Sequence, residues 1–588
     1  MPETKRNRSR AVRSGKPYVT TNRTRQGRRV YEYVVLRYEE VDEEGRRHSR
    51  PLVSLGRSEE VDRGKAETLA DLMREFVRPG STLTVDELRA HLSGAKEKLK
   101  FLCSRQFGLR FLVEQAFAEL GYKEVLAEID LETRRRFSIE RAVFGMVLQQ
   151  IVWPGSKLRA AERLGDVVFF PEGEGLAVHH FYRALDELSE HVERVEAKLR
   201  EVLLRQEGLI FDEIGNDTTS SYFETDYDDV EWKEIAGEPD PNRKVPPVVN
   251  DPPLRMRGHS KDKRPNKPQI VVDQTLSHGY IIDHDTLPGN TADQTRLSAK
   301  VAKLAQLGVA QDAVWIADTG MNTASTREAL AMHQVDWVMG EGRSKTKLVK
   351  ELLSSGGRFA PHPDNPDLAF RAHRRDDRLF VVRLNRKERK RELRKINRHV
   401  DKVREFLAKD DRADDHGLNV CRLLTHGNYK RYVIRRADDP GRLTLDPRAV
   451  KRAKNRAGKS AISTSLDGLH PVVADDLYRL HFDVEAAFRT LKSGLELRPI
   501  RHRRANRIKA HVLVEVMAYN VVRHLERKTG QTLARLRDLL ASACVQRVQL
   551  GAASFWQSVE LTPGQQAVFA LLGYDLPLPR FETQVLSA

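Results

Sequence analysis

The order of strand-like and helix-like segments between residues 207 and 340 is the feature that most constrains the fold. Three apolar, strand-like stretches come first, two of them flanking a turn, and a helical pattern, a strand, a second helical pattern and a last strand follow. These segments lie at 207–224, 268–287, 292–308, 312–318, 322–334 and 335–340. Three strands followed by alternating helices and strands predict an α/β fold, a mixed sheet with helices on both faces.

A very basic stretch from 343 to about 470 interrupts the alternation of strands and helices. A helical pattern follows it at Tyr478–Lys492. The apolar stripe of this helix comprises Val484, Phe488 and Leu491. Glu485 lies next to the stripe, and Tyr478 and Lys492 lie two helical turns before and after it, so the three polar groups share one face. A carboxylate this close to a core face is either solvated or held there for a function.

Two aspartates occupy positions that suit a site shared with Glu485. Asp318 ends the strand 312–318, and α/β sheets place functional groups at the carboxyl ends of strands. Asp217 lies on the first strand, which we expect to be central; Asp212, with Glu213, competes with it for this role. Each acid taken singly also fits an ordinary turn, cap or ion-pair position.

Three converging carboxylates repel one another unless a cation neutralises them. Hard oxygen ligands select Mg²⁺ or Mn²⁺, and two such ions about 4 Å apart are the arrangement used for phosphoryl transfer. The acids therefore predict a site for two ions, with Asp217, Asp318 and Glu485 as catalytic metal ligands.

The charge distribution indicates a polyanionic partner. The chain of 588 residues has a formal net charge of +17, and its basic residues form runs at 5–16, 383–404, 451–459 and 498–509. Four dispersed runs without a long acidic counterweight favour contacts with nucleic acid phosphates over a merely solvated surface. No apolar run is long enough to span a membrane and the first residues lack a signal-peptide core, so we expect a cytoplasmic protein without a membrane partner.

Several motifs together resemble the DDE-type transposases of bacterial insertion sequences, in the group marked by a Tyr-Arg-Glu-Lys signature. Their order and spacing match from Asp217 to His511, and the N-terminal part resembles the same group. The motifs are "NDTTSSYFE", "GHSKDKRPNKPQIVV", "LPGNTAD", "IADTGM" and "YRLHFDVEAAFRTLKSGLELRPIRHRRANRIKAH".

The resemblance implies a ribonuclease H-like core with Asp217, Asp318 and Glu485 as metal ligands. Asp217 is preferred to Asp212 because it heads "DTTSSYFE". The signature maps onto Tyr478, Glu485 and Lys492, but His481 stands where the pattern has Arg, and a neutral imidazole is a weaker anion partner than a guanidinium. Tyr478 and Lys492 are expected to hold DNA phosphate near the metals, with Arg489 and Arg498 as secondary candidates.

Six segments follow from the pattern and the resemblance. We expect a basic arm with a small β unit (1–80), a helical domain that is a candidate for DNA binding (81–205), the first part of the catalytic domain (206–342), a β-rich insertion (343–470), the second part of the catalytic domain (471–525) and a C-terminal helical tail (526–588).

The implied function is that of a cut-and-paste DNA transposase in the bacterial nucleoid. It would bind terminal inverted repeats, cleave them and join them to target DNA, acting as a homodimer in a synaptic complex. Two alternatives stay open. One is a ribonuclease H-like nuclease that only hydrolyses DNA, and the other is a DNA-binding derivative that has lost catalysis.

Overall fold

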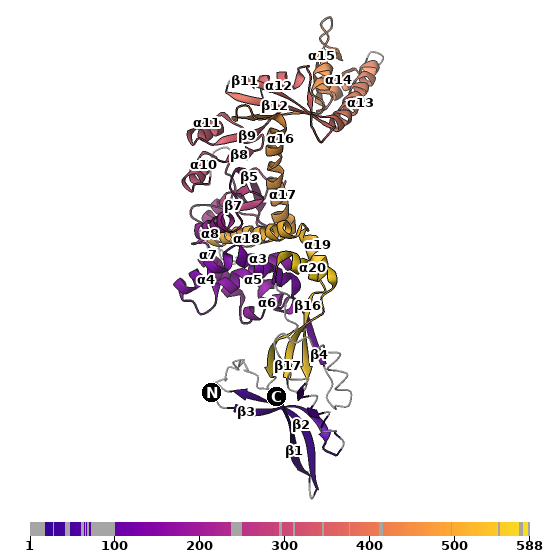
Figure 1. The fold of residues 1–588 in the computed structure, drawn as a ribbon. Helices are drawn as coiled ribbons and strands as arrows, with labels where there is room; N and C mark the ends of the chain where they lie inside the picture. The colour runs from indigo at the N-terminus through magenta and orange to yellow at the C-terminus, as the bar shows by residue number, and fades with distance from the viewer. Residues whose placement is uncertain are drawn as a thin grey trace. The chain divides into compact units, whose positions relative to one another are not determined.

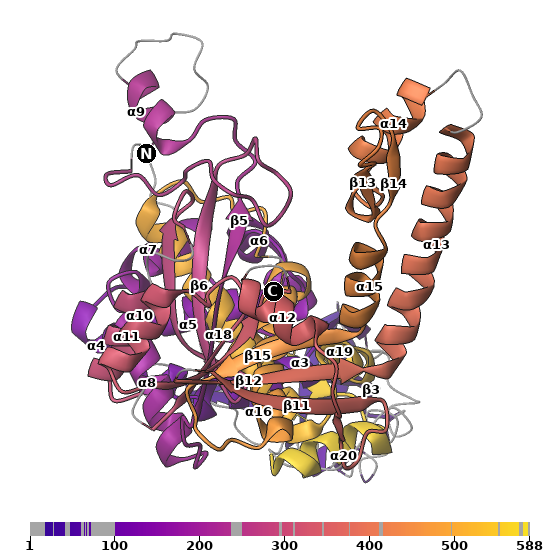
Figure 2. The ribbon, with the colours of Figure 1, turned by 90° about the horizontal axis from the view of Figure 1, so that it is seen from above.

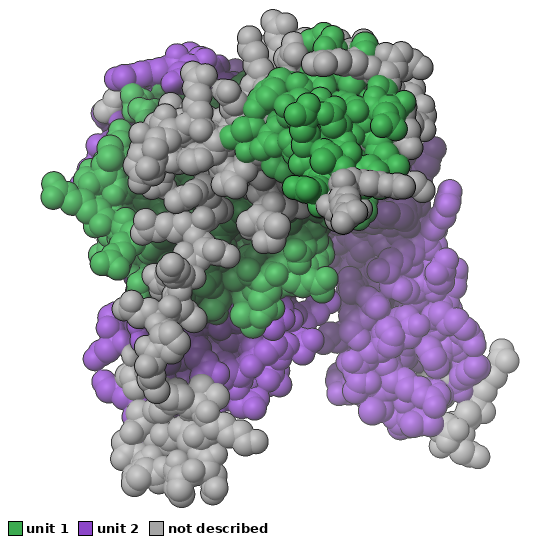
Figure 3. Space-filling view, turned by 90° about the horizontal axis from the view of Figure 1, so that it is seen from below, with its two compact units in different colours: residues 1–202, 510–588 green, residues 203–509 purple. Residues whose placement is uncertain are grey.

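The chain divides into two compact units, residues 1–202 with 510–588, and residues 203–509 (Figure 3). The computed structural model describes residues 18–26, 29–41, 47–59, 61, 64, 66–67, 70–71, 100–236, 248, 250–292, 297–309, 312–343, 346–375, 377–410, 416–495, 497–550, 553–574 and 580–585.

A mixed sheet forms the centre of the unit 203–509. Its described strands run in the order β10-β11-β12-β15-β9-β8-β5-β6-β7 (Figure 1). The strands β5, β6 and β7 pair antiparallel, whereas β5, β8 and β9 pair parallel. The bounds are β5 (Glu213–Tyr222), β6 (Gln269–Ser277), β7 (Tyr280–Pro288), α10 (Leu297–Gln306), β8 (Val314–Ala317), α11 (Ala324–Met332) and β9 (Asp336–Glu341). The predicted order of three strands, helix, strand, helix and strand is therefore confirmed.

The insertion after β9 differs from the expected β-rich segment. Four of its strands extend the main sheet beyond β9: β10 (Ala360–Pro361), β11 (Leu368–Arg375), β12 (Arg378–Asn385) and β15 (Lys459–Thr464). The helix α12 (Lys347–Ser354) packs on this part of the sheet, and the remainder is mainly helical and projects from the sheet (Figure 2). It comprises α13 (Arg386–Asp410), α14 (His416–Thr425), β13 (Val433–Arg435), β14 (Leu443–Leu445) and α15 (Pro447–Arg456).

This projecting part has a hydrophobic core of its own. Its buried residues are Val400, Val403, Leu423, Tyr432 and Leu443. On α13 the apolar positions recur every three or four residues between basic ones, the pattern of an amphipathic helix. The high charge of the segment therefore marks the solvent face of a helix and not a β structure.

Three helices follow β15. They are α16 (Pro471–Arg479), α17 (His481–Arg489), which runs into a π-helical turn at Thr490–Gly494, and α18 (Ala505–Thr529). The helix α16 packs on β9 and its neighbours, and α17 packs on β5. Since π-helical turns are found frequently at functional sites, the turn directly after α17 is a marker for one.

The other unit combines helices with two smaller sheets. The small β unit expected within 1–80 is a three-stranded antiparallel sheet of β1, β2 and β3. The bounds are β1 (Tyr18–Gln26), β2 (Arg29–Val41), β3 (Arg47–Arg57), β4 (Lys100–Gln106), α3 (Gly108–Glu119), α4 (Tyr122–Thr133), α5 (Ile139–Val152), α6 (Lys157–Val167), α7 (Val178–Leu188) and α8 (Val192–Arg205).

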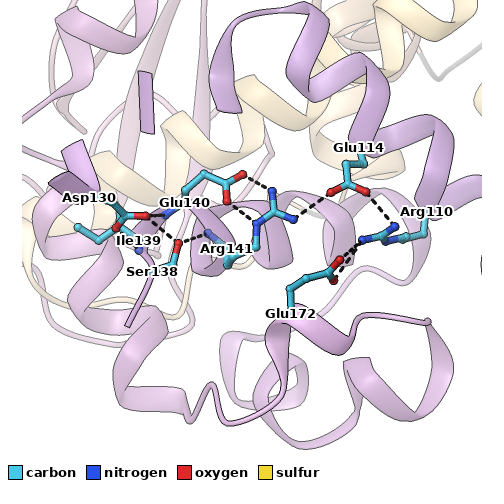
Figure 4. A network of polar contacts seen from close by, with 8 residues as sticks. All are labelled: Arg110, Glu114, Asp130, Ser138, Ile139, Glu140, Arg141 and Glu172. Atoms are coloured by element: carbon cyan, nitrogen blue, oxygen red, sulfur yellow. Dashed lines mark hydrogen bonds and ion pairs between the residues drawn. The ribbon is translucent and has the colours of Figure 1, made fainter. Parts of the chain in front are cut away.

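A polar network ties the helices of this unit together (Figure 4). The Asp130 carboxylate, at the end of α4, accepts hydrogen bonds from Ser138 Oγ at 2.7 Å and from the Ile139 amide at 2.5 Å. It thereby satisfies donors at the start of α5, which would otherwise be unpaired. A chain of ion pairs then links α5 to α3 and to the 3₁₀ turn at Pro171–Gly173 through Glu140, Arg141, Glu114, Arg110 and Glu172.

The segment 526–588, expected as a helical tail, contains strands as well. After α19 (Leu533–Leu540) come β16 (Cys544–Leu550), β17 (Ala553–Ser558), α20 (Pro563–Leu572) and β18 (Arg580–Val585). The strand β16 also pairs with β4, which lies in the region expected to be helical. Pairing between segments more than 400 residues apart leaves no local signal, and this explains the difference.

No helix within the described residues is long and apolar enough to cross a membrane.

A buried lysine holds together the aspartates on one face of the main sheet. Lys300 on α10 lies 2.5 Å from Asp283 Oδ2 and 3.5 Å from Asp273 Oδ2, and it also contacts Asp285. Burial opposes the charged form of Lys300, but the three carboxylates outweigh this effect and raise the lysine pKa. The side chain of Lys300 is only 2% exposed, so its charge is compensated by these aspartates rather than by water.

We expect Lys300→Met to destabilise the protein by about 3–5 kcal/mol, because it leaves buried carboxylates without their main cation. Lys303→Met is the control, since the Lys303 side chain is 33% exposed and its loss should cost less. Denaturant unfolding of both variants measures the difference. Equal losses, or no loss in Lys300→Met, would contradict the role given to this cluster.

Candidate active site

The register of the parallel strands brings Asp217 and Asp318 together. Gly215 of β5 pairs with Ile316 of β8, and counting two residues further along both strands places Asp217 beside Asp318. Neighbouring strands lie about 4.8 Å apart, so the two carboxylates start from adjacent backbone positions. They also leave the sheet on the same face, because residues two apart in a strand point the same way.

The helix α17 covers this face and carries Glu485. A Cβ atom at Gly215 would lie 2.8 Å from Val484 Cγ2, closer than such contacts allow, so the helix can approach β5 only because residue 215 is a glycine. Val484 is buried against the strand while Glu485, the next residue, is exposed. The sequence therefore predicted correctly that Glu485 lies beside a core stripe, and the structure places it over the strand of Asp217.

Tyr478 connects α16 to Asp318. Its hydroxyl donates a hydrogen bond of 3.4 Å to Asp318 Oδ1. Burial, then the negative charge of Asp318, raises the pKa of the Tyr478 hydroxyl, and Glu485 adds to the shift. Tyr478 is thus a protonated donor at neutral pH, close to both acids.

Gly340 makes room for this hydroxyl. The pairing of β8 with β9 ends at Ala317 and Met339. One residue further along both strands, Gly340 lies next to Asp318, so Asp217, Asp318 and Gly340 line up in one row. A Cβ atom at Gly340 would lie 2.3 Å from the Tyr478 hydroxyl oxygen and 2.8 Å from Thr319 Oγ1. No pattern in the sequence indicates this requirement.

Asp318 does not cap the helix that follows it. The N-cap of α11 is Thr323, whose side chain accepts a hydrogen bond from the Thr326 amide. Asn322 holds the turn between Asp318 and α11, because its side-chain amide donates a hydrogen bond of 3.0 Å to the Gly340 carbonyl. The Asp318 side chain is therefore left exposed at the end of its strand, without a structural role at the helix.

Two polar side chains lie near Asp217. Lys261 Nζ is 3.6 Å from Asp217 Oδ1 and partly balances its charge. Gln274 pairs with Asp217 across β5 and β6, is fully buried, and has neither its amide nitrogen nor its amide oxygen in a hydrogen bond with the described residues. Buried polar atoms without partners usually mark a place for ordered water or an ion. The sequence reasoning missed Gln274, although it is a polar residue inside an apolar strand.

The competing acids lie at the other end of β5. Asp212 precedes the strand and its Oδ1 lies 3.0 Å from His278 Nε2, while Glu213 Oε1 accepts from the His278 amide at 3.3 Å. Five residues of extended chain separate Asp212 from Asp217, roughly 17 Å at the strand rise. The geometry therefore favours Asp217 as the partner of Asp318.

The carboxylates are gathered on one face but do not enclose a single ion. Asp217, Asp318 and Glu485, all of them among the described residues, do not place three ligand oxygens within 4.8 Å of one another.

A basic groove adjoins α17. It has a volume of about 330 Å³ and is lined by Lys261, Asp262, Lys263, Phe488, Arg489, Lys492 and Arg498. Lys492 Nζ lies 2.7 Å from Asp262, which also pairs with Arg498 and is only 3% exposed. Burial lowers the pKa of the Lys492 ammonium, and Asp262 opposes this shift. The structure thus brings the predicted residues Arg489, Lys492 and Arg498 together, and Asp262 orients two of them.

His481 does not face this groove. Its ring stacks on Tyr478 with centroids 4.3 Å apart, and its Nδ1 lies 2.5 Å from the Tyr478 carbonyl oxygen. The side chain is buried, so its position favours support of Tyr478 over contact with a phosphate.

Part of the chain matches a known protein family. Residues 248–521 match the family model of the transposase DDE domain, a range that contains Asp318 and Glu485 but begins after Asp217. This match supports a DDE-type transposase. No curated protein matches the chain.

Among solved structures, the chain is similar to one described as the cryo-EM structure of the piggyBac transposase synaptic complex with hairpin DNA. The two are 12% identical, the match covers 76% of this chain and 79% of that one, and the TM-score is 0.33. A likeness at this level does not define a shared fold.

We expect Gly340→Ala to lower the free energy of unfolding by about 1–3 kcal/mol, because the new methyl group collides with the Tyr478 hydroxyl. Gly320→Ala is the matched control, since a Cβ there meets nothing within 4 Å. In the double variant with Tyr478→Phe part of the loss should be recovered, which a double-mutant cycle measures. Additive losses would show that the two residues are not in contact.

Proposed function

We propose that this chain is a DNA transposase that transfers phosphoryl groups at a site formed by Asp217, Asp318 and Glu485. The observation that carries the proposal is the row of Asp217 and Asp318 on paired parallel strands, with Glu485 above it on α17. The strand order β7-β6-β5-β8-β9, antiparallel and then parallel, supports a ribonuclease H-like core. The transposase DDE domain matched by residues 248–521 agrees with this reading.

The donor set fits divalent ions. Three carboxylates that are open to solvent supply hard oxygen ligands, which suit Mg²⁺ or Mn²⁺, and the unpartnered amide of Gln274 could bind a water molecule of their hydration shell. The ions, when bound, would supply Lewis-acid activation and charge neutralisation at phosphorus.

The protein side chains around the acids orient the ligands and the DNA. Tyr478 holds Asp318 by a hydrogen bond, and His481 packs behind the Tyr478 ring. Arg489 at the end of α17, Lys492 in the π-helical turn and Arg498 beyond that turn present positive charge along one groove, where a DNA phosphate would lie beside the carboxylates. These contacts are to the backbone, so they position the strand without reading its sequence.

The substrate would be the terminal inverted repeats of an insertion sequence in a bacterial nucleoid, cut and joined to target DNA. Joining two ends requires a synaptic complex, for which we propose a homodimer. The purely hydrolytic nuclease is the alternative from the same chemistry, and it would make no joined products. The presence of all three acids and Lys492 argues against a derivative without catalysis.

We expect Asp318→Asn and Glu485→Gln to lower the rate of Mg²⁺-dependent cleavage by at least roughly 100-fold, because each removes a charged ligand of the ions. The assay uses the purified protein and DNA from both flanks of its own gene. Binding of the same DNA should change little, and chelation of the metal by EDTA should stop cleavage until Mg²⁺ or Mn²⁺ is restored.

Asp483→Asn is the matched control, because Asp483 is an exposed acid on the same helix, two residues before Glu485. Its cleavage rate should equal that of the unmodified protein. Cleavage that survives in Asp318→Asn or Glu485→Gln would refute the assigned site. Cleaved products without any joined products would favour the hydrolytic nuclease.

We expect Lys492→Met to weaken DNA binding equally for different sequences and to reduce the slope of log K against log salt by about 1, as for one lost phosphate contact. Lys347→Met, at an exposed position on α12 (Lys347–Ser354), is the control and should leave the slope unchanged. Thermal unfolding verifies that both variants are folded. A sequence-dependent loss would indicate that Lys492 contacts a base instead.

A further inference from the structure

Two basic runs that lie far apart in the sequence meet in the insertion. The runs 383–404 and 451–459 lie mainly on α13 and α15, which pack side by side past the ends of β12 and β15 (Figure 2). A groove of about 560 Å³ lies between them. It is lined by six cationic side chains, Arg343, Arg391, Lys395, Arg431, Arg452 and Arg456.

The carboxylates of the groove are engaged within the protein. Glu392 lies 2.7 Å from Arg343 and accepts a hydrogen bond of 2.8 Å from the Gly458 amide, while Glu388 lies 2.7 Å from Arg391. Six cations face these two acids, so the lining carries an excess of four positive charges. Like charges held this close together repel one another, and a bound anion would relieve the repulsion.

The pKa values of two side chains in the lining reflect burial and the positive charges nearby. Burial, then repulsion from Lys395 and Arg431, lowers the pKa of His399, which lines the same groove. Burial, then repulsion from Arg452, likewise lowers the pKa of Arg456. The guanidinium groups therefore sit where additional negative charge stabilises them.

The walls of the groove are held in place by hydrophobic packing. Val400 and Val403 of α13 are buried in the core that also contains Tyr432 and Leu443. The partly buried Ile396 and Ala453 pack against that core and line the groove as well. Because the backbone on both sides is fixed, the cations stay close together without a ligand, as in a preorganised binding site.

We propose that this groove binds the phosphodiester backbone of duplex DNA, at a site separate from Asp217, Asp318 and Glu485. Arginine forks match phosphate oxygens, and five of the six cations are arginines. The 25 residues of α13 span about 37 Å, close to one turn of duplex DNA. The choice of DNA as the polyanion rests on the proposed function. The groove contacts backbone and thus binds without sequence preference.

The test is the affinity of the full-length protein for a 20-base-pair duplex of unrelated sequence, measured by fluorescence anisotropy in EDTA over a range of salt concentrations. The groove variant combines Arg391→Ala, Lys395→Ala and Arg452→Ala, all at exposed positions. The control combines Lys402→Ala, Arg404→Ala and Lys409→Ala, which remove the same number of charges from α13 outside the groove. Circular dichroism verifies that both variants are folded.

We expect the groove variant to bind at least roughly tenfold more weakly and to reduce the salt slope by about 2–3, at close to 0.9 per lost phosphate contact, while the control changes less than about twofold. Unchanged binding by the groove variant overturns the proposal, as does an equal loss in the control. The readout needs neither metal nor cleavage, so it is separate from the test of the proposed function. If the groove variant loses affinity while the unmodified protein cleaves no DNA, the groove proposal stands and the transposase proposal is rejected.

Discussion

The pairing of β5 with β8 and of β8 with β9 is the constraint on which the candidate site depends. The register of these parallel pairs ends at Gly215 with Ile316 and at Ala317 with Met339. Extended along the same strands, it places Asp217, Asp318 and Gly340 in one row, so the two acids are neighbours before any side chain is considered. A slip of one residue in either pair would move an acid to the opposite face. Gly215 then lets α17 approach closely, and Gly340 leaves room for the hydroxyl of Tyr478. The two glycines, which carry no side chain, are therefore as important for the site as the three carboxylates.

The acids on the two faces of the main sheet have different surroundings. On the face covered by α10, Lys300 neutralises Asp273, Asp283 and Asp285 inside the protein, and Asn216 donates a hydrogen bond of 2.8 Å to Asp273. On the other face, Asp318 and Glu485 are exposed and Lys261 remains 3.6 Å from Asp217. Asn216 and Asp217 are consecutive residues of β5 that point to opposite faces. Internal compensation on one side makes the strand stable, whereas the charge on the other side stays accessible to an external cation.

Much of this arrangement could be predicted from the sequence, because it depends on local patterns. The strand order, the position of Asp318 at a strand end, and the place of Glu485 beside an apolar stripe all follow from periodicity. Other features depend on which segments pair or pack, so periodicity does not reveal them. They are the requirement for glycine at 215 and 340, the contact of Asp262 with Lys492, and the buried Gln274 amide, which has no hydrogen-bond partner among the described residues. The same limit explains why β12 and β15 were not expected to extend the main sheet, and why β16 was not expected to pair with β4.

The continuity of the insertion with the sheet bears on how the two basic surfaces could act together. The strand β12 ends at Asn385 and α13 begins at Arg386, while only Ala457 and Gly458 separate α15 from β15. Both walls of the groove between α13 and α15 are therefore direct continuations of strands of the main sheet, β12 and β15, and β15 pairs with β9, the neighbour of β8. No flexible linker intervenes on either side. A duplex held in the groove through its phosphates would keep a fixed position relative to the carboxylates, so backbone contacts alone could direct which bond reaches them, without any base being read.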